Sequence, residues 1–419
     1  MENAKLAKKK RQTMFTHQFF DLLLNLGDNW QVKKVEADYK LSEIYVFIEF
    51  IGNQAEDSET MEMCKLYDHA PERTWRHLDT MQYKTYIKCK LPRIKDKKGK
   101  VVTITPPWAS KHERHTYLFE HAIIDLLLVT KNQTKTAELM RCGFNVINRV
   151  IHLSTERGMS RRNLSDLPFE HLSIDEKSFK KGHKYVSVLS HPRSGIIIDI
   201  EDGRTKESVR ALLDKSLTEQ QQKNLKTLSM DMWKAYLSVA KEKLPNAEIV
   251  HDRFHLIKYL NDAIDKVRKR EVKTNEELRN SRYALLKNEK NLTEKQRIKF
   301  DAIRQSNYQV SKAWEVRENF KDLFNKEHDK ESAFILFMRW VKSSKDFMIK
   351  ETTKIVEMFK SHLQGVINAL ITTFNNAMAE RLNGKIQELK TAGRGYRTFE
   401  KFRSAILFFN GGLNLYPLN

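Results

Sequence analysis

Three acidic residues stand where their carboxylates can share one site. Asp175 lies in a β-rich run, Asp231 closes a later apolar run, and Glu380 lies in a helical stretch. Carboxylates that are brought together repel one another unless a cation neutralises them. Their hard oxygen ligands suit Mg²⁺ or Mn²⁺, and two such ions about 4 Å apart can support phosphodiester chemistry. We therefore expect a site for two divalent cations if the fold brings the three residues together.

The helical stretch around Glu380 has two distinct faces. Apolar residues recur at helical spacing at Ile371, Phe374, Met378, Leu382, Ile386 and Leu389. The far side carries Thr373, Asn376, Glu380, Asn383 and Gln387. Asn is a poor helix former, and solvated helix faces normally carry Lys, Glu and Arg. This polar face is either a plain surface stripe or part of a polar site. In the second case Asn376 and Asn383 could orient Glu380 or contact DNA.

The two aspartates belong to a pattern of alternating strands and helices. The runs HLSIDEKSF, HKYVSVLSH and GIIIDIEDG, separated by short turns, predict an antiparallel meander. A helix follows, then a strand ending at Asp231, a helix, a strand ending at Asp252, and another helix. This is the order of a ribonuclease H-like α/β domain, in which Asp175 and Asp231 face one another at strand ends. Taken singly, an Asp at a strand end more commonly caps the next helix.

Two helical regions complete this part of the chain. From about residue 275 to 361 the sequence is charged, favours helices and is poor in Gly and Pro, which predicts a helical insertion. The last segment, GYRTFEKFRSAILFFNGG, predicts one more amphipathic helix. The stretch that carries Glu380 lies between them.

A helix-turn-helix is predicted upstream of the strands. Residues 116–130 read as a helix, and TKTAELMRCGFNVINRVIHL reads as two helices joined at Cys142 and Gly143, where the glycine permits the turn. The inward residues of the second helix are expected to be Phe144, Ile147, Val150 and Ile151. Its outward residues, which could contact bases in a DNA major groove, are Asn145, Asn148, Arg149 and His152. An ordinary helical hairpin in a core is the alternative.

The N-terminal region predicts a short helix at 14–26, a strand pair, and a small ribbon-like module from Met61 to Ile104. The module contains Cys64, His69, His77 and Cys89. Structural zinc sites usually show paired Cys-x2-Cys ligands, but Tyr67 and Lys98 stand where second members would be. The spacing therefore argues against bound zinc.

The composition indicates an anionic partner. The 419 residues include 75 Lys and Arg against 54 Asp and Glu, a net charge of +21, which favours nucleic acid. A membrane surface is the runner-up, but the charge is spread along the chain and no apolar run approaches the roughly 18 residues that span a bilayer. Three cysteines without framework spacing and an N-terminus without the apolar core of a signal peptide predict a cytoplasmic protein.

Several segments resemble the DDE transposases of bacterial insertion sequences, specifically the IS-L-three (ISL3) family. These are IDEKSFKKGHKYVSV, SMDMWKAY, IVHDRFHLIKYLNDAIDKVRKRE and NNAMAERLNGKIQELKTAGRGYRTFEKFRSAILF. The resemblance covers nearly the whole chain. It implies that Asp175, Asp231 and Glu380 are the catalytic, metal-binding triad, with a helical insertion in the 149 residues that separate Asp231 from Glu380. The HDRFH motif matches a D-x2-H signature that places Asp252 and His255 near the site.

The N-terminal module departs from this family. Members usually carry a zinc ribbon with four cysteines, whereas only Cys64 and Cys89 remain here, and Tyr67, Lys95 and Lys98 cannot supply thiolates. We therefore expect a degenerate, metal-free ribbon.

The predicted fold is multidomain α+β. Its expected parts are an N-terminal module with the degenerate ribbon (1–110), a helix-turn-helix (111–160), a ribonuclease H-like domain (168–272 and 364–419) and its helical insertion (273–363). The resemblance implies a bacterial, nucleoid-associated enzyme that binds terminal inverted repeats in double-stranded DNA, cleaves the ends and joins the 3′-OH ends to target DNA. A homodimer or larger assembly is expected. Further phosphate contacts are expected from Lys385, Lys390 and Arg394.

Two alternatives remain open. One is a DNA-binding regulator or domesticated transposase whose carboxylates are only structural. The other is a ribonuclease H-like nuclease that cuts without joining.

Overall fold

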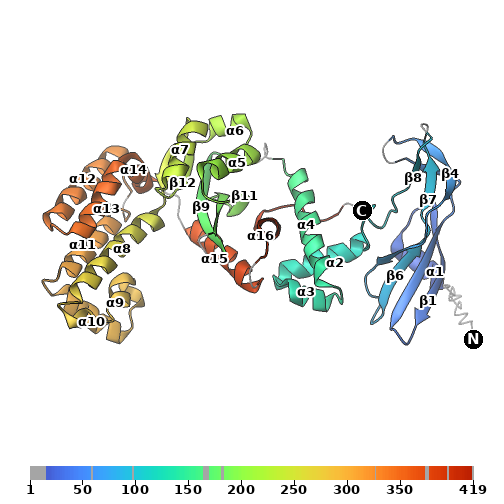
Figure 1. Cartoon of the computed structure of the whole chain (residues 1–419), viewed down its shortest axis with the longest axis horizontal. Helices are drawn as coiled ribbons and strands as arrows, with labels where there is room; N and C mark the ends of the chain where they lie inside the picture. Colours follow the sequence, from blue (N-terminus) through green and yellow to red (C-terminus); the bar gives the residue numbers. More distant parts are fainter. Residues whose placement is uncertain are drawn as a thin grey trace, which may run out of the picture. The chain divides into compact units, whose positions relative to one another are not determined.

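The computed structural model describes residues 16–57, 60–96, 99–163, 169–180, 184–325, 327–372, 377–393 and 396–417. The chain forms two compact units, Met1–Arg161 with Asn414–Asn419, and Arg162–Leu413. Figure 1 traces the elements of both along the sequence. None of the helices in the described ranges combines the length and hydropathy needed to span a membrane.

The first unit begins with helix α1 (Thr16–Leu24) and two four-stranded sheets, ordered β1-β2-β6-β5 and β3-β4-β7-β8. Strand β6 pairs with β2 in parallel, and the other pairs in both sheets are antiparallel. The strands are β1 (Trp30–Asp38), β2 (Glu43–Phe50), β3 (Gln54–Glu56), β4 (Met63–His69), β5 (Arg73–Arg76), β6 (Lys84–Cys89), β7 (Pro92–Lys95) and β8 (Val101–Thr103). The two predicted strands and small ribbon are thus part of a larger β structure.

The two N-terminal cysteines lie in separate apolar clusters. Cys89 packs with Val46, Trp75 and Trp108 in the core beneath the first sheet. Cys64 packs in the other sheet with Ala55 and Ile94. Burial raises the pKa of the Cys89 thiol to about 12, so this sulfur stays protonated at neutral pH.

Three helices complete the first unit: α2 (Tyr117–Thr130), α3 (Gln133–Leu139) and α4 (Phe144–Arg161). Ile147, Val150 and Ile151 of α4 are buried, as the sequence predicted. Phe144 is 47% exposed, so its predicted inward position is wrong. It is the first residue of α4, and the buried stripe begins one turn later.

The turn between α3 and α4 does not depend on its glycine. Arg141 is the residue with positive φ, at 48°, and a Cβ added to Gly143 would meet nothing within 4 Å. The Arg141 guanidinium donates to the Asp79 carboxylate and to the Gln82 carbonyl oxygen, at 2.9 Å for the latter. Long-range hydrogen bonds therefore hold this turn, for which the sequence predicted a role of the glycine.

The C-terminal segment returns to these helices. Arg157 donates to the carbonyl oxygen of Leu415 at 2.6 Å, and the Tyr416 hydroxyl donates to Asp125 at 2.7 Å. The last described residues are therefore part of the first unit, although the second unit precedes them in sequence.

The second unit contains a five-stranded sheet of order β11-β10-β9-β12-β13. Strands β9, β10 and β11 form the predicted antiparallel meander, while β12 pairs in parallel with β9 and with β13. The strands are β9 (His171–Lys180), β10 (Lys184–His191), β11 (Ile196–Asp202), β12 (Thr227–Met230) and β13 (Glu248–His251). This order matches the predicted alternation of strands and helices.

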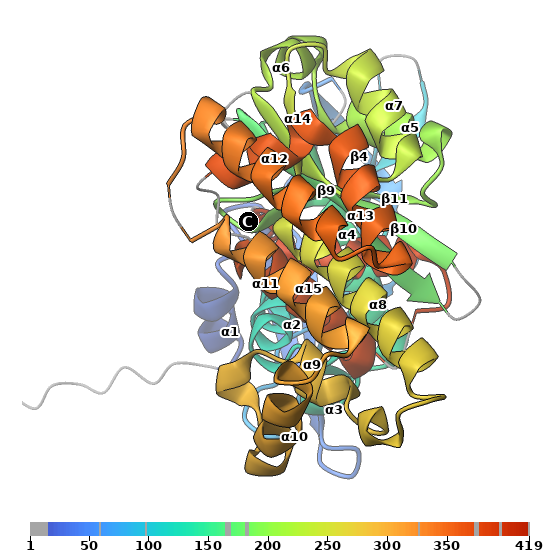
Figure 2. The same cartoon turned by 90° about the vertical axis from the view of Figure 1, so that its left-hand side faces the viewer.

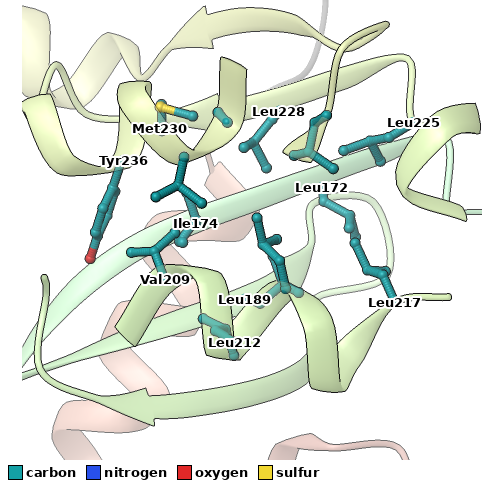
Figure 3. Close-up of a cluster of buried hydrophobic side chains, with 14 of the residues drawn as sticks. Leu172, Ile174, Leu189, Val209, Leu212, Leu217, Leu225, Leu228, Met230 and Tyr236 are labelled. Carbon is teal, nitrogen blue, oxygen red and sulfur yellow. The ribbon is translucent and has the colours of Figure 1, made fainter. Parts of the chain in front are cut away.

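One face of this sheet is covered by α5 (Lys206–Ser216) and α7 (Lys234–Lys243), with α6 (Glu219–Asn224) between them in sequence. Figure 3 shows the side chains of the sheet and of these helices meeting in one apolar cluster. The Tyr236 hydroxyl within it lies 2.8 Å from the hydroxyl of Ser187. On the sheet's other side, Phe402 of α16 (Phe399–Asn410) contacts Phe179, and Arg403 forms a bidentate pair with buried Asp199.

Every secondary-structure element described between residues 253 and 371 is a helix. They are α8 (Arg253–Glu271), 3₁₀ helix η2 (Glu276–Leu278), α9 (Arg282–Leu286), 3₁₀ helix η3 (Glu289–Asn291), α10 (Glu294–Arg304), α11 (Gln309–Asp322), α12 (Lys330–Asp346), α13 (Lys350–Ser361) and α14 (Leu363–Ile371). In Figure 2, α8, α11, α12 and α13 pack side by side. Their core includes Phe320, Phe337, Trp340 and Phe359.

Candidate active site

The first acidic residue, Asp175, lies in the middle of β9 opposite Val188 of β10. Lys177 of the same strand places its ammonium 2.6 Å from Asp175 Oδ2. Burial by itself would raise the pKa of Asp175, but the hydrogen bond from His255 and the positive charge of Lys177 outweigh it and lower the pKa to about 2. Asp175 is therefore ionised at neutral pH.

The second acidic residue, Asp231, follows the last residue of β12. The backbone N–H of Met232 donates to Asp231 Oδ1 at 2.7 Å. The Tyr259 hydroxyl, from α8, donates to the same carboxylate at 3.1 Å from Oδ1 and 3.3 Å from Oδ2. Two donors thus fix the carboxylate at the carboxyl end of the strand.

His255 brings the two aspartates together. Its Nε2 lies 3.6 Å from Asp175 Oδ1, and its Nδ1 lies 3.4 Å from Asp231 Oδ2. Burial would lower the pKa of His255, but the Asp175 hydrogen bond and the charges of both aspartates raise it. The predicted convergence of Asp175 and Asp231 is therefore present, with a histidine between the carboxylates.

Asp252 caps α8 next to this pair. Its carboxylate accepts a hydrogen bond from the Phe254 backbone N–H at 2.8 Å. Burial raises its pKa, and the negative charges of Asp175 and Asp231 add to that shift. Asp252 thus lies near the site, where its observed contact is a helix cap.

Helix α15 (Ala377–Ala392) carries the third predicted carboxylate. Glu380 and Asn383 lie within it, but their side chains are outside the described part, and Asn376 and Arg394 lie wholly outside it. Leu382, Ile386 and Leu389 are buried, as the predicted apolar stripe requires. Lys385 is exposed. The Lys390 ammonium donates to the Ser178 carbonyl oxygen at 2.7 Å, which ties α15 to β9, the strand of Asp175.

Comparison with known proteins identifies the family. The sequence model of the ISL3-type DDE transposases, described as "Transposase", matches residues 172–406, more than half of the chain. The chain belongs to the ISL3 family of DDE transposases. Its catalytic domain therefore has the ribonuclease H-like fold that the family implies, and the chain is an enzyme of the transposase class.

Two curated transposases are similar over most of their length. The transposase for insertion sequence element IS1001 of Bordetella parapertussis is 25% identical over 303 residues, which are 70% of this chain and 73% of that protein. The transposase for IS1557 of Mycobacterium tuberculosis, in strains CDC 1551 and H37Rv, is 24% identical over 358 residues. That match covers 78% of this chain and 79% of the relative.

The donor set of the transposase fits a divalent cation. Asp175 and Asp231 present the hard carboxylate oxygens that such a cation prefers, and a bound cation would take over contacts that Lys177 and His255 make with those oxygens. Within the described ranges no group of three or more His, Cys, Asp or Glu residues is placed to hold a metal. The third carboxylate ligand predicted from the sequence is Glu380, whose side chain lies outside those ranges.

The four predicted base-contacting residues of α4 differ in their contacts. Asn145 is exposed. The Asn148 amide donates to the Phe144 carbonyl oxygen at 3.2 Å, and His152 Nε2 lies 3.3 Å from Glu156. The Arg149 guanidinium donates to both carboxylate oxygens of buried Glu113, with Nε 2.7 Å from Oε2. Asn145 is thus the exposed one of the four for which no side-chain hydrogen bond or ion pair to a described residue is seen.

Sequence reasoning missed Tyr259 and the exposed aromatic residues that follow the ends of β12 and β13. Tyr259 follows His255 by four residues, a spacing that places both on one face of α8 and could have revealed it. Trp233 and Phe254, each just beyond a strand end, are 42% and 47% exposed. The Arg204 guanidinium packs between the rings of Trp233 and Tyr185, 4.7 and 4.1 Å from their centroids. No local pattern in the sequence predicts the packing of Arg204 against Trp233 and Tyr185.

Proposed function

We propose that this transposase binds the terminal inverted repeats of its insertion sequence, cleaves the DNA at the ends and transfers the 3′-OH ends to target DNA. The observation that carries the proposal is the convergence of Asp175 and Asp231 on His255. In this arrangement the two carboxylates, with Glu380, would hold two Mg²⁺ or Mn²⁺ ions. When bound, such ions supply charge stabilisation to a phosphodiester undergoing in-line attack.

The chain's own residues prepare this site. Asp175 is ionised because His255 and Lys177 hold its pKa low. Tyr259 and the Met232 N–H orient Asp231 by donating to its carboxylate. The excess of basic residues attracts the phosphates, so binding should weaken steeply with salt.

We assign recognition of double-stranded DNA to α3 and α4, the predicted helix-turn-helix. Asn145 is its exposed polar residue nearest the start of α4, and Asn148, Arg149 and His152 lie on the same side. Lys385 and Arg394 are proposed phosphate contacts, and Lys390 is one if its bond to Ser178 opens. Because one element has two ends, we propose that a homodimer or larger assembly holds both.

An end-cleavage assay with Mn²⁺ on wild type and Asp231→Asn tests the proposal. We expect both proteins to bind the repeats and only wild type to cut them. Equal inactivity of both proteins on bound repeats would favour a DNA-binding regulator. Joining of a labelled 3′-OH end to a plasmid then separates a transposase from a nuclease, which yields cuts without joined product.

A further inference from the structure

The solvent-facing side of the sheet β1-β2-β6-β5 carries a strip of aromatic rings among lysines. Alternation along a strand sends Val46 and Ile48 into the core and leaves Tyr45 and Phe47 on the opposite side. The parallel pairing of β2 with β6 sets Tyr86 beside Tyr45, and their rings stack at 5.7 Å. The aromatic strip, Tyr45, Phe47 and Tyr86, is half-buried and faces away from the core.

Lysines lie over these rings. Lys34 and Lys88 flank Phe47 in the sheet register, with ammonium groups 4.4 and 5.4 Å from the ring centroid. Lys88 is also 4.2 Å from the ring centroid of Tyr45. No carboxylate in the described ranges forms an ion pair with Lys88. Its charge therefore rests on aromatic rings and is open to an anion.

The carboxylates of this face have partners of their own. Glu43 accepts hydrogen bonds from the hydroxyls of Tyr45 and Tyr86. Glu36 pairs with Lys34, and Glu49 accepts from Lys33 and Gln31. These contacts fix the rings and give each of these three carboxylates, Glu36, Glu43 and Glu49, a hydrogen-bond or ion-pair partner.

A cleft of about 400 Å³ adjoins the aromatic strip. Phe47 and Lys88 line it, together with three further basic residues, Lys33, Lys90 and His69, and two carboxylates, Glu49 and Glu72. Its volume lies within the range of small-ligand pockets, so it can receive one nucleotide. The cations and the ring of the strip thus continue into an open cleft.

From these features we infer that this face binds an unpaired DNA strand, with bases on the aromatic strip and phosphates at Lys34 and Lys88. Exposed aromatic side chains stack on unpaired bases, because the bases of a duplex already stack on one another. Cations beside the rings meet the phosphates that accompany each base. The choice of DNA rests on the proposed function, whereas the binding itself requires neither divalent cations nor the carboxylates of the second unit.

The test measures binding of the full chain to labelled oligothymidylate of about 16 nucleotides, in EDTA, by fluorescence anisotropy. Phe47→Ala and Tyr86→Ala are each expected to weaken binding about tenfold, and binding of a duplex of equal length should not change. Phe47→Leu keeps apolar volume without a π face and is expected to behave like Phe47→Ala. Lys88→Gln should weaken binding and reduce its salt dependence.

Tyr67→Ala is the matched control. Tyr67 is 57% exposed on β4 of the other sheet and also lies near a lysine, with Lys95 6.0 Å from its ring centroid. The Tyr67→Ala variant should bind oligothymidylate like wild type. Asp231→Asn should do so too, so the binding result can be interpreted even if the proposed cleavage is not observed. Wild-type binding by both Phe47 variants, or equal weakening by Tyr67→Ala, would overturn the inference. So would a change of oligomeric state in Phe47→Leu with unchanged DNA binding, because the face would then contact a second copy of the chain.

Discussion

The hydroxyl of Tyr259 donates to the carboxylate of Asp231, 3.1 Å from Oδ1 and 3.3 Å from Oδ2. The two residues are far apart in sequence, and the bond joins α8 to the end of β12. Because Asp231 is a proposed metal ligand, Tyr259 sets the orientation in which its oxygens meet a cation.

Tyr259→Phe should therefore raise the Mg²⁺ concentration needed for end cleavage by about tenfold, since partners of metal ligands typically contribute 10- to 100-fold to affinity or activity. The measurement is a Mg²⁺ titration of cleavage with bound repeats. Tyr308→Phe is the control, because the Tyr308 hydroxyl donates to Glu277 in the helical insertion at 3.0 Å. Equal Mg²⁺ requirements in Tyr259→Phe and wild type would contradict the assigned role.

His251 makes the stability of the second unit depend on pH. It is 3% exposed, and burial lowers its pKa to about 4. The unfolded chain has the higher pKa and takes up the proton first, so this contribution to stability is complete above about pH 6.5 and falls as the pH drops toward 4. At pH 5 the loss is about 2 kcal/mol. Urea unfolding at pH 7 and pH 5 should show this loss in wild type and not in His251→Gln.

Gly365 of α14 makes room for the same histidine. A Cβ at this position would lie 2.4 Å from Cδ2 of His251, a ring that is buried in the fold. Gly365→Ala should therefore lower the free energy of unfolding by about 1–3 kcal/mol, as overpacking does. Gly384→Ala is the matched helical control, because its Cβ would meet nothing within 4 Å. It should leave stability unchanged or raise it by up to about 1 kcal/mol through helix propensity. Equal stability of the two variants would contradict this prediction and would show that α14 and His251 can shift to make room for a methyl group.

Asn145 and Arg149 should respond differently to mutation. Asn145→Ala should weaken binding to the terminal repeat about tenfold and leave thermal stability unchanged, because the side chain is exposed and a base contact contributes about 1–3 kcal/mol. Arg149→Ala should lower thermal stability, since it leaves buried Glu113 without its bidentate partner. Repeat binding and melting temperature are measured for both variants. Asn53→Ala, another exposed residue of the first unit, is the control; if it weakened binding as much as Asn145→Ala, α4 would not be the reading helix.

Local patterns in the sequence determined much of the second unit. The β-rich runs around Asp175 and the apolar runs ending at Asp231 and Asp252 predicted the strand order, because alternation and turn residues report burial directly. The charged, glycine-poor stretch predicted the helical insertion. The position of Glu380 on a helix with a buried apolar face also followed from spacing, while its place as a metal ligand stays a prediction.

Only the tertiary structure decided which distant groups meet. The parallel pairing of β2 with β6, the Arg149 pair with Glu113 and the place of His255 between Asp175 and Asp231 each join segments well separated in sequence. Periodicity states which face of an element is buried, but it does not name the partner across the contact. When several oppositely charged residues could pair with one side chain, the distances in the folded chain decide which of them is its partner. The sequence therefore determined the elements and the chemistry of the carboxylates, and the fold decided how their charges are paired.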